Sequence, residues 1–378
     1  MVVIATGLAL LGAACGAPTA AAAEGEPVIE DVSSEQASFR VVQVASGLER
    51  PWAMAFLPDG RVLVTERVGR LKLIESDGSV EEVSGLPSIA AVGQGGLLDV
   101  ALHPDYDAFG RIYLSYVYRD AGGLGTAVAR ASLSGNRLEN VETIFRMEPT
   151  SSGSRHFGSR FAFLSDGTLL FTIGDRGNRP RAQDLGDHAG KTLRINADGS
   201  VPSDNPFVDR AGAMAEIYTY GNRNAQGMTV HPDTGTVWQH EHGPRGGDEI
   251  NIIESGVNYG WPEITYGEAY SGGAIGSGTS RSGMAEPIIH WTPSIAPSGM
   301  DFYEGERFPE WQGDLFVGAL AGQHLRRVEV SGERVVEQEM LLQRRLGRIR
   351  DVVSGPDGYL YLLTDSNDGG LFRLEPSN

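Results

Sequence analysis

One short phrase returns along this chain of 378 residues and limits what the chain can fold into. It is a turn resembling Pro-Asp-Gly followed by alternating apolar residues, which is typical of a tight turn that leads into a β-strand. Copies lie at 57–65, 103–116, 164–172, 231–238, 311–317 and 355–363. Spacings of roughly 45 to 80 residues suit blades that carry insertions. We therefore predict an all-β, six-bladed β-propeller with four-stranded antiparallel blades, in preference to a pair of β-sandwiches.

Composition supports an all-β chain and argues against two kinds of partner. The 51 glycines favour numerous tight turns over long helices. The net charge of -18 is spread along the chain, without a block of lysines and arginines that would follow a phosphate backbone. We therefore expect no nucleic-acid partner and no binding to an anionic membrane surface, and we interpret the charge as a solubilising face.

The first 38 residues differ in composition from the rest. Residues 1–23 combine a short apolar stretch with a run of small residues, which is typical of an export signal or a lipoprotein-like leader. Cys15 is the only cysteine, so it excludes an internal disulfide, and it is a candidate for a lipid anchor. Residues 24–38 are acidic and small and predict a linker. We expect the propeller domain over 39–378, in a periplasmic or secreted protein with or without lipid anchoring to the membrane.

Two long polar stretches interrupt the repeats. Residues 176–218 and 267–286 are rich in glycine and longer than ordinary connections. Long irregular connections in a compact domain are often functional, and in propellers the loops on one face surround the central channel. The functional site is therefore expected at that face.

The first stretch that carries chemistry reads Arg-His-Phe-Gly-Ser-Arg at 155–160 and is followed by a strand that ends near Asp175. A carboxylate there could accept the Nδ1 proton of His156, which would fix the tautomer and leave Nε2 free as a base. A turn and a cap are the alternative. This pair alone leaves both interpretations open.

Two polar runs suit an anionic ligand. Arg223, Asn224 and Gln226 form a dense run of planar hydrogen-bonding side chains, which fits an anionic or quinonoid ligand. Strand alternation sends Arg348 and Arg350 to the same side, where on a channel wall they need an anion or a carboxylate partner. The alternatives are a solvated loop for the first run and an outward-facing pair for the second.

A third run, 240–251, carries metal-ligating residue types. His240 and His242 alternate onto one face of a strand, a pattern compatible with zinc. Glycines, proline and carboxylates dominate the run, however, and exposed carbonyls with Asp248 and Glu249 offer the hard oxygen ligands that suit calcium. We therefore favour calcium over zinc.

Taken as a set, these stretches resemble a known family. The matching segments, in the family's order, are 93–98, 155–160, 221–227, 241–249, 258–262 and 348–351. They resemble the glucose/sorbosone dehydrogenases, and most of all the soluble aldose sugar dehydrogenases that use pyrroloquinoline quinone (PQQ). The resemblance covers about 39–375. It implies a PQQ- and Ca²⁺-dependent enzyme that oxidises the C1 hydroxyl of an aldose to a lactone.

The resemblance also implies roles for individual residues. His156 matches the base that removes the proton of the C1 hydroxyl while hydride passes to the quinone. Asp175 matches the carboxylate that orients this histidine, and Arg350 matches the arginine beside the reacting carbonyl. Positions that match cofactor contacts are Gln94, His156, Arg223, Asn224, Gln226, His242, Ser294, Arg348 and Arg350. Tyr270 resembles an aromatic lid over the cofactor.

The implied calcium ligands are the backbone carbonyls of Gly243 and Pro244, with Glu249 and the Tyr259 carbonyl at a second site. One departure lies in the expected cofactor-binding set. Leu320 and Ala321 stand where many relatives have a lysine that contacts PQQ. We expect either a weaker cofactor affinity or another cation in that place.

We expect an aldose substrate, an external electron acceptor such as a quinone, a dye or a cytochrome, and a monomer or homodimer. Two alternative functions are a calcium-dependent hydrolase of the lactonase type and a non-catalytic propeller that binds a glycan or a protein. The paired arginines and glutamine contacts disfavour the hydrolase. The presence of both His156 and Asp175 disfavours the non-catalytic binder.

Overall fold

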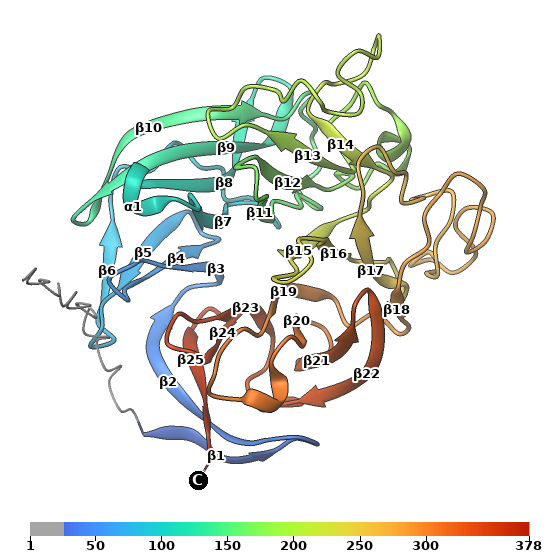
Figure 1. Cartoon of the computed structure of the whole chain (residues 1–378). Coiled ribbons are helices and arrows are strands. Elements are labelled where there is room, and N and C mark those ends of the chain that lie inside the picture. Colours follow the sequence, from blue (N-terminus) through green and yellow to red (C-terminus); the bar gives the residue numbers. More distant parts are fainter. Residues whose placement is uncertain (1–25, 378) are drawn as a thin grey trace, which may run out of the picture.

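Each copy of the repeated turn leads into a strand, as the sequence predicts, and the structure places it between the first and second strands of a sheet (Figure 1). A computed structural model describes residues 26–377. The first strands are β3 (Pro51–Phe56), β7 (Leu97–Leu102), β11 (Phe161–Phe163), β15 (Ala225–Val230), β19 (Pro297–Phe302) and β23 (Ile349–Ser354). Consecutive first strands contact one another and β23 contacts β3, so six blades form a closed propeller.

Three further strands complete each blade. The second strands are β4 (Val62–Glu66), β8 (Arg111–Asp120), β12 (Leu169–Ile173), β16 (Val237–Glu241), β20 (Leu315–Ala319) and β24 (Leu360–Thr364). The third strands are β5 (Arg70–Ile74), β9 (Gly123–Ser134), β13 (Lys191–Ile195), β17 (Asp248–Ile253), β21 (His324–Ser331) and β25 (Gly369–Pro376). The outer strands are β6 (Val80–Val83), β10 (Arg137–Arg146), β14 (Ile217–Tyr220), β18 (Ile289–Trp291), β22 (Arg334–Leu341) and β2 (Ser38–Leu48). The described helices are short: α1 (Tyr106–Phe109), η1 (Arg179–Gln183) and η2 (Pro309–Trp311).

Both ends of the described chain lie in one sheet. The outer strand β2 pairs antiparallel with β25, which closes the ring between the start and the end of the chain. The prediction of a linker over 24–38 is wrong for β1 (Pro27–Ser33), which pairs with β2 and adds a fifth strand to this blade. Ile29 and Val32 are buried against the core on either side of an irregularity in the pairing, and this burial explains the strand.

Two further expectations concern the long stretch 176–218 and the leader over 1–23. The stretch 176–218 is not only a connection, because it contains η1, all of β13 and the start of β14. The leader over 1–23 and the lipid anchor at Cys15 fall outside the described residues. Between residues 26 and 377, no helix combines the length and the apolar content that crossing a membrane requires.

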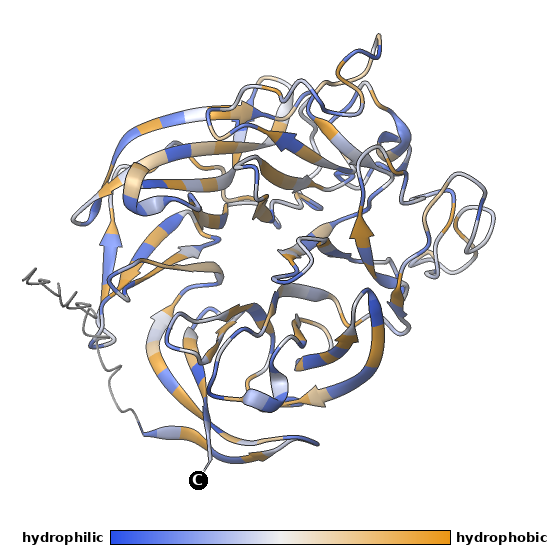
Figure 2. Ribbon diagram, viewed as in Figure 1, coloured by the Kyte–Doolittle hydropathy of each residue, from blue (hydrophilic) through white to orange (hydrophobic). Residues whose placement is uncertain are grey.

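The core lies between neighbouring blades. Apolar residues alternate with polar ones along the outer strands in Figure 2, which lets each sheet bury side chains against the next. Trp238 and Phe302 meet edge to face, with ring centres 5.5 Å apart. Phe39 of β2 lies 5.4 Å from Trp311 in the same geometry. Such aromatic contacts fix the blades relative to one another and thereby place the loops at the ends of the ring.

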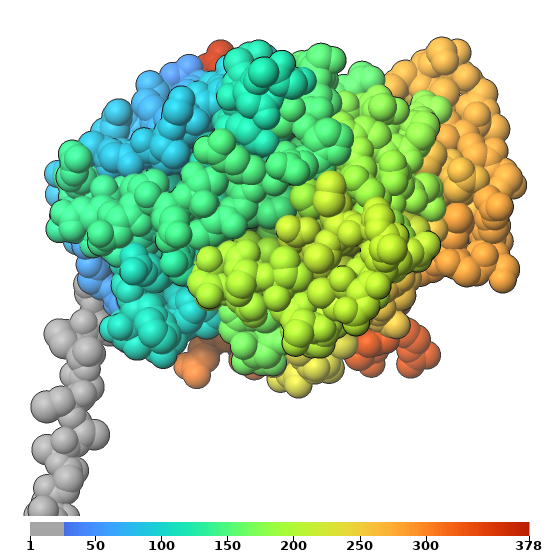
Figure 3. All heavy atoms as spheres, turned by 90° about the horizontal axis from the view of Figure 1, so that it is seen from above, coloured from blue at the N-terminus to red at the C-terminus, as the bar shows by residue number. Residues whose placement is uncertain are grey.

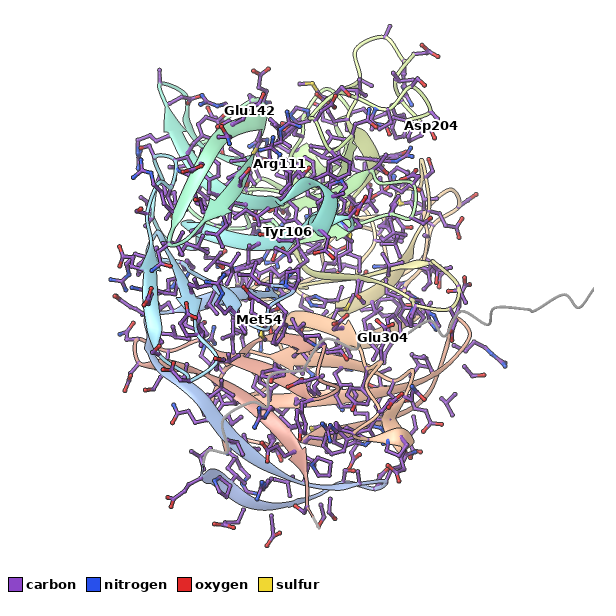
Figure 4. All side chains as sticks on the ribbon, turned by 60° about the vertical axis from the view of Figure 1, so that its left-hand side comes forward. Met54, Tyr106, Arg111, Glu142, Asp204 and Glu304 are labelled. Atoms are coloured by element: carbon purple, nitrogen blue, oxygen red, sulfur yellow. The ribbon has the colours of Figure 1, made fainter. Side chains whose placement is uncertain are left out.

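Charged side chains fill the middle of the ring. A cavity of about 310 Å³ lies at the far ends of the first strands, and Met54 and Glu304 line it (Figure 4). Within the ring, Arg160 lies 3.3 Å from Asp99 and 3.0 Å from Asp351. Asp351 also accepts a hydrogen bond from the Met54 backbone N–H at 2.9 Å, which joins neighbouring blades. These paired charges fill the central channel between its two ends.

Replacement of Trp311 by alanine should lower the free energy of unfolding by about 3–5 kcal/mol, because it leaves a cavity beside Phe39 and Phe308. Guanidinium unfolding followed by circular dichroism measures the change. Val336→Ala on the exposed face of β22 is the control and should change stability by less than about 0.5 kcal/mol. A loss below about 1 kcal/mol for Trp311→Ala would contradict this role of the aromatic cluster.

Candidate active site

The candidate site lies at the end of the ring where first strands begin and second strands end. In antiparallel neighbours these two ends lie side by side. Shortly before first strands come Gln94, His156, Arg223, Asn224, Ser294 and Arg348, and shortly after second strands come Asp175, His242, Leu320 and Asp365. The closed ring therefore brings residues that are far apart in the sequence to one end of the central channel. We call the end that carries these residues the mouth.

His156 is held from its ring and from its backbone. Its Nδ1 lies 2.6 Å from Asp175 Oδ1. Since a carboxylate only accepts hydrogen bonds, Nδ1 carries the proton and Nε2 of the neutral imidazole is free. Asp175 also accepts hydrogen bonds from Trp261 Nε1 at 2.8 Å and from the Gly177 N–H at 2.7 Å. The His156 N–H donates to Gln94 Oε1 at 2.8 Å, so Gln94 contributes to the site by positioning the histidine loop.

Two glycines allow the backbone path of the His156 loop. His156 has φ +55°, an uncommon value for a residue with a side chain, and Gly158 follows at +63°. A Cβ at Gly158 would lie 2.8 Å from the Thr172 carbonyl, and one at Gly174 would lie 2.4 Å from the His156 carbonyl oxygen. A larger residue at either glycine would therefore push the loop outward and separate His156 from Asp175.

The surroundings keep His156 neutral at pH 7. Burial lowers the pKa of His156 below its usual 6.5, and the opposing effect of the Asp175 hydrogen bond does not reverse the shift. The charge of Arg223 lowers this pKa further. Burial raises the pKa of Asp175, but its hydrogen bonds to His156 and the Gly177 N–H outweigh burial, so Asp175 stays ionised. A neutral imidazole with a free Nε2 is the form that a general base requires.

Arginines gather around Asp365 at the same mouth. Asp365 Oδ2 accepts hydrogen bonds from Arg348 at 3.0 and 3.1 Å and from Arg350 at 3.1 Å. Arg350 also donates to Gln226 Oε1 at 2.9 Å, while its buried Nε has no hydrogen-bond partner among residues 26–377. Burial raises the pKa of Asp365, but the charges of Arg350 and Arg348 outweigh burial and lower it. The two arginines thus share one side, and Asp365 is their carboxylate partner.

Asp365 and Arg67 were not predicted as site residues from the sequence. Asp365 directly follows the second strand of the sixth repeat, and Asp175 follows the second strand of the third. Arg67 directly follows β4, the second strand of the first repeat, and donates to the Gly93 carbonyl oxygen. The charges of Asp365 and Arg348 both act on the pKa of Arg67, which burial lowers. Comparison of equivalent repeat positions would have identified both residues.

Arg223 connects the histidine loop to the run that follows β16. It donates from one terminal nitrogen to the carbonyl oxygens of His242 and Gly243, at 2.9 and 3.0 Å. Its backbone N–H bonds to the Glu241 carboxylate, and its carbonyl oxygen accepts the Asp175 N–H at 2.8 Å. Arg223 therefore fixes the Gly243 carbonyl and the backbone of Asp175 relative to each other.

Asn224 and His242 extend this frame. Asn224 Oδ1 accepts the Gly158 N–H at 3.2 Å, and the Asn224 carbonyl oxygen accepts the His242 N–H at 3.1 Å. His242 Nε2 donates to the Pro297 carbonyl oxygen at 2.5 Å, and His240 Nε2 bonds to the Ser298 carbonyl oxygen. The two histidines therefore point at separate carbonyls, which disfavours the zinc alternative. Among the described residues, no three His, Cys, Asp or Glu side chains form a metal-binding group.

Asp248 organises loops rather than presenting free oxygens. It accepts hydrogen bonds from Ser294 Oγ at 2.8 and 2.9 Å, from the Ile295 N–H at 2.7 Å and from the Gly243 N–H at 2.8 Å. The idea of Asp248 as a calcium ligand therefore finds no support in this geometry. Ser294 lies at the mouth with its hydroxyl donated to this carboxylate.

Leu320 and Ala321 lie against the same loop. The Leu320 N–H donates to the Ala296 carbonyl oxygen, and the Ala321 N–H donates to the Ile295 carbonyl oxygen, each at 2.9 Å. Leu320 is buried and Ala321 is exposed. The backbone of this segment thus bonds to the loop at the mouth, and neither position supplies a cationic side chain.

Two buried carboxylates face each other across neighbouring strands. Glu241 of β16 lies directly opposite Glu249 of β17. Both border a cavity of about 10 Å³, room for one ion or water, which Gly243 and Tyr259 also line. Burial raises the pKa of Glu249 well above its usual value, and the nearby Glu241 charge raises it further. A bound cation would relieve this repulsion.

The insertion over 267–286 projects from the ring beside this cavity (Figures 1 and 3). Its first residues pack on the run 240–251. A Cβ at Gly267 would lie 2.7 Å from Pro244, and the backbone of Glu268 forms a β-bridge with Arg245. Tyr270 lies further along the loop and is 69% exposed. A lid formed by Tyr270 would therefore require the projecting loop to fold inward.

The pKa of His156, measured by NMR titration of its imidazole, should lie below 6.5 because of burial. Asp175→Asn should lower it further, since the carboxylate stabilises the protonated ring. Any activity that uses neutral His156 should therefore be lost only as the pH falls through this low pKa. Asp184→Asn, at an exposed position of the stretch 176–218, is the control. An unchanged or higher pKa in Asp175→Asn would contradict the interpretation of this pair.

The chain matches known proteins over nearly its whole length. The Glucose / Sorbosone dehydrogenase model matches residues 48–373. Aldose sugar dehydrogenase YliI of Escherichia coli (strain K12) is 45% identical over 349 residues, which cover 90% of this chain and 94% of that protein. The structure of the soluble aldose sugar dehydrogenase from Escherichia coli in the apo-form gives a TM-score of 0.88 at 44% identity, over 90% of this chain and 100% of that one.

A further solved structure carries the cofactor that the sequence resemblance implies. The PQQ-bound form of aldose sugar dehydrogenase from Streptomyces coelicolor gives a TM-score of 0.73 at 30% identity, over 90% of this chain and 99% of that one. The family match begins at the end of β2 and ends within β25, so it includes every blade. On this evidence the chain belongs to the glucose/sorbosone dehydrogenase family.

Proposed function

We propose that this protein is a PQQ- and calcium-dependent dehydrogenase that oxidises the C1 hydroxyl of aldoses to lactones. The observation that carries the proposal is the neutral His156, oriented by Asp175, at the same mouth as Arg223, Arg348 and Arg350. A base and a set of fixed cations at one site suit removal of a proton together with stabilisation of negative charge. The PQQ-bound Streptomyces relative and the sugar dehydrogenase relatives support this assignment.

The residues at the mouth fit an anionic quinone. PQQ carries several carboxylates, and arginines bind carboxylates through a planar fork of donors. Arg350 is the strongest candidate contact, because its buried Nε lacks a hydrogen-bond partner among the described residues. Arg348 is 45% exposed at its side chain and so remains accessible from the mouth. We also assign Gln94, Asn224, Gln226, His242 and Ser294 to the proposed set of cofactor contacts.

Arg67 is our candidate for the cation that replaces the family lysine. Leu320 and Ala321 supply no charge, whereas Arg67 sits in the electrostatic field of Asp365 and Arg348. It enters the mouth from the first blade, at a position equivalent to Asp365 in the sixth. The loss of a lysine at one blade is therefore compensated by an arginine at another.

The protein's own groups perform the proton chemistry. PQQ, when bound, would supply the hydride acceptor. His156 Nε2 takes the proton of the sugar C1 hydroxyl, and Asp175 stabilises the imidazolium that results. Arg350 places a fixed positive charge where negative charge develops on the acceptor side. Trp261 and Gly177 hold Asp175 in place through their hydrogen bonds to its carboxylate.

Two positions are proposed for calcium. The Gly243 carbonyl, held by Arg223, and the neighbouring Pro244 carbonyl would bind the ion at the mouth. Glu249, with the Tyr259 carbonyl, would bind a second ion in the small cavity, and we add Glu241 to this set because it lies opposite Glu249. Oxygen ligands of this kind suit calcium, whose charge would polarise a nearby quinone carbonyl.

Export, an external electron acceptor and a monomeric or homodimeric state remain predictions from the sequence. The leader-like composition of 1–23 supports a periplasmic or secreted location, with lipidation at Cys15 as a further prediction.

His156→Ala should lower aldose oxidation by about 10²–10⁴-fold, because it removes the general base. The assay follows dye reduction by protein reconstituted with PQQ and calcium, across a panel of aldoses. PQQ binding, measured separately by fluorescence titration, should largely survive. His103→Ala, in the turn between β7 and β8 at the other end of the ring, is the control. If the unaltered protein oxidises no aldose under these conditions, the proposed function is wrong.

Calcium should raise the thermal unfolding midpoint of the unaltered protein by a few degrees, since a ligand that binds only the folded state stabilises it. Glu249→Gln should remove the part of this response that comes from the second site. Without calcium, Glu249→Gln should be at least as stable as the unaltered protein, because one of two repelling buried carboxylates is gone. Glu254→Gln, at an exposed position nearby, should keep the full response. A calcium response as large in Glu249→Gln as in the unaltered protein would refute the second site.

A further inference from the structure

A further cavity is lined by residues next to the catalytic pair in the sequence and has no role in the proposed reaction. It measures about 450 Å³ and lies between the segments 151–155 and 176–181. The first segment directly precedes His156, and the second directly follows Asp175. Its volume falls within the range of about 300–1,000 Å³ that is usual for small-molecule pockets.

The cavity is positively charged in a strongly negative protein. Its lining contains Arg155, Arg176 and Arg181 and no carboxylate, although the chain carries a net charge of -18. Asp187 pairs with Arg181 at 2.6 and 2.9 Å and offsets that charge. Burial lowers the pKa of Arg176 to about 9, with the Arg181 charge adding to the effect, so Arg176 is still charged at pH 7. The Asp175 charge also acts on Arg176, so three arginines against two nearby carboxylates leave an excess of positive charge.

The cavity wall is held in a fixed shape by Arg176. Its two terminal nitrogens donate to the carbonyl oxygens of Arg155 and Gly153, each at 2.5 Å. Its guanidinium lies 3.4 Å from the centre of the Phe157 ring. Arg155 itself is exposed, and its Nε lies against Gly177, where a Cβ would come within 2.4 Å. Arg176 thus stabilises the wall of the cavity, while the exposed guanidinium of Arg155 is available to bind a ligand.

Hydrogen-bond donors surround Arg155 at the rim. Ser152, Ser154 and Asn178 line the cavity with exposed side chains. Hydroxyl, amide and guanidinium donors around a positive pocket are the groups that bind carboxylates and phosphates. We propose that this pocket binds an anionic group, a carboxylate or a phosphate, carried by the sugar whose C1 hydroxyl lies at His156. The identity of the substrate rests on the proposed function, whereas anion binding by the pocket does not.

Isothermal titration of the full chain at low salt, without added cofactor, tests the pocket directly. Glucose 6-phosphate or glucuronate should bind more tightly than glucose, and the stronger of the two identifies the anionic group. Arg155→Gln should weaken this binding by about tenfold, since one charge-assisted hydrogen bond is lost. Arg334→Gln, at an exposed position of β22, is the matched control and should bind as the unaltered protein does. Binding of inorganic phosphate as tight as that of glucose 6-phosphate would overturn the proposal, because the sugar would then contribute nothing.

Turnover of protein reconstituted with PQQ and calcium supplies the second arm. The ratio of kcat/KM for the anionic sugar to kcat/KM for glucose should fall about tenfold in Arg155→Gln, with glucose oxidation unchanged. Glucose oxidation without preferential binding or use of either anionic sugar would overturn this inference and leave the proposed function intact. Binding that depends on Arg155, without oxidation of any sugar, would overturn the proposed function and leave the anion pocket.

Discussion

The antiparallel pairing of β2 with β25 is the constraint on which the site depends. It runs from Phe39 opposite Pro376 to Leu48 opposite Gly369 within the last blade, and β2 leads directly into β3 of the first blade. The cationic cluster spans this closure, because Arg67 follows β4 while Arg348 and Asp365 belong to the last blade. An open ring would separate these groups, so the proposed cofactor site exists only in the closed propeller.

Below the mouth, a chain of polar contacts connects the site to the middle of the ring. Gln226 accepts a hydrogen bond from Arg350 at its side chain and one from Arg160 at its backbone oxygen, at 2.9 and 3.0 Å. Arg160 in turn pairs with Asp99 and Asp351. Because each cation has fixed partners, the donors at the mouth are positioned before any ligand arrives, which is the condition for electrostatic stabilisation without reorganisation.

The sequence predicted the blades because the repeated turns depend on local chemistry, which a single chain displays directly. It pointed to Asp175 only when the surrounding motifs were taken as a set, since the pair alone also suits a turn and a cap. Glu241 and Asp365 were missed for a different reason, because their importance arises from contacts with residues of other strands or blades. The linker interpretation failed at β1 since a short strand gains its stability from β2 and not from its own composition.

The cations and the base make opposite demands on the site, and Asp175 reconciles them. Arg223 and burial lower the pKa of His156, which keeps the imidazole neutral but also disfavours the protonated form that follows proton uptake. The Asp175 carboxylate opposes both effects through its hydrogen bond to Nδ1. Its own ionisation is secured by the Gly177 N–H, and Trp261 donates to its second oxygen. A base among arginines therefore needs a buried carboxylate that stabilises its protonated form. The 258–262 loop is part of the site, because its Trp261 bonds to Asp175, which lies far from this loop in the sequence.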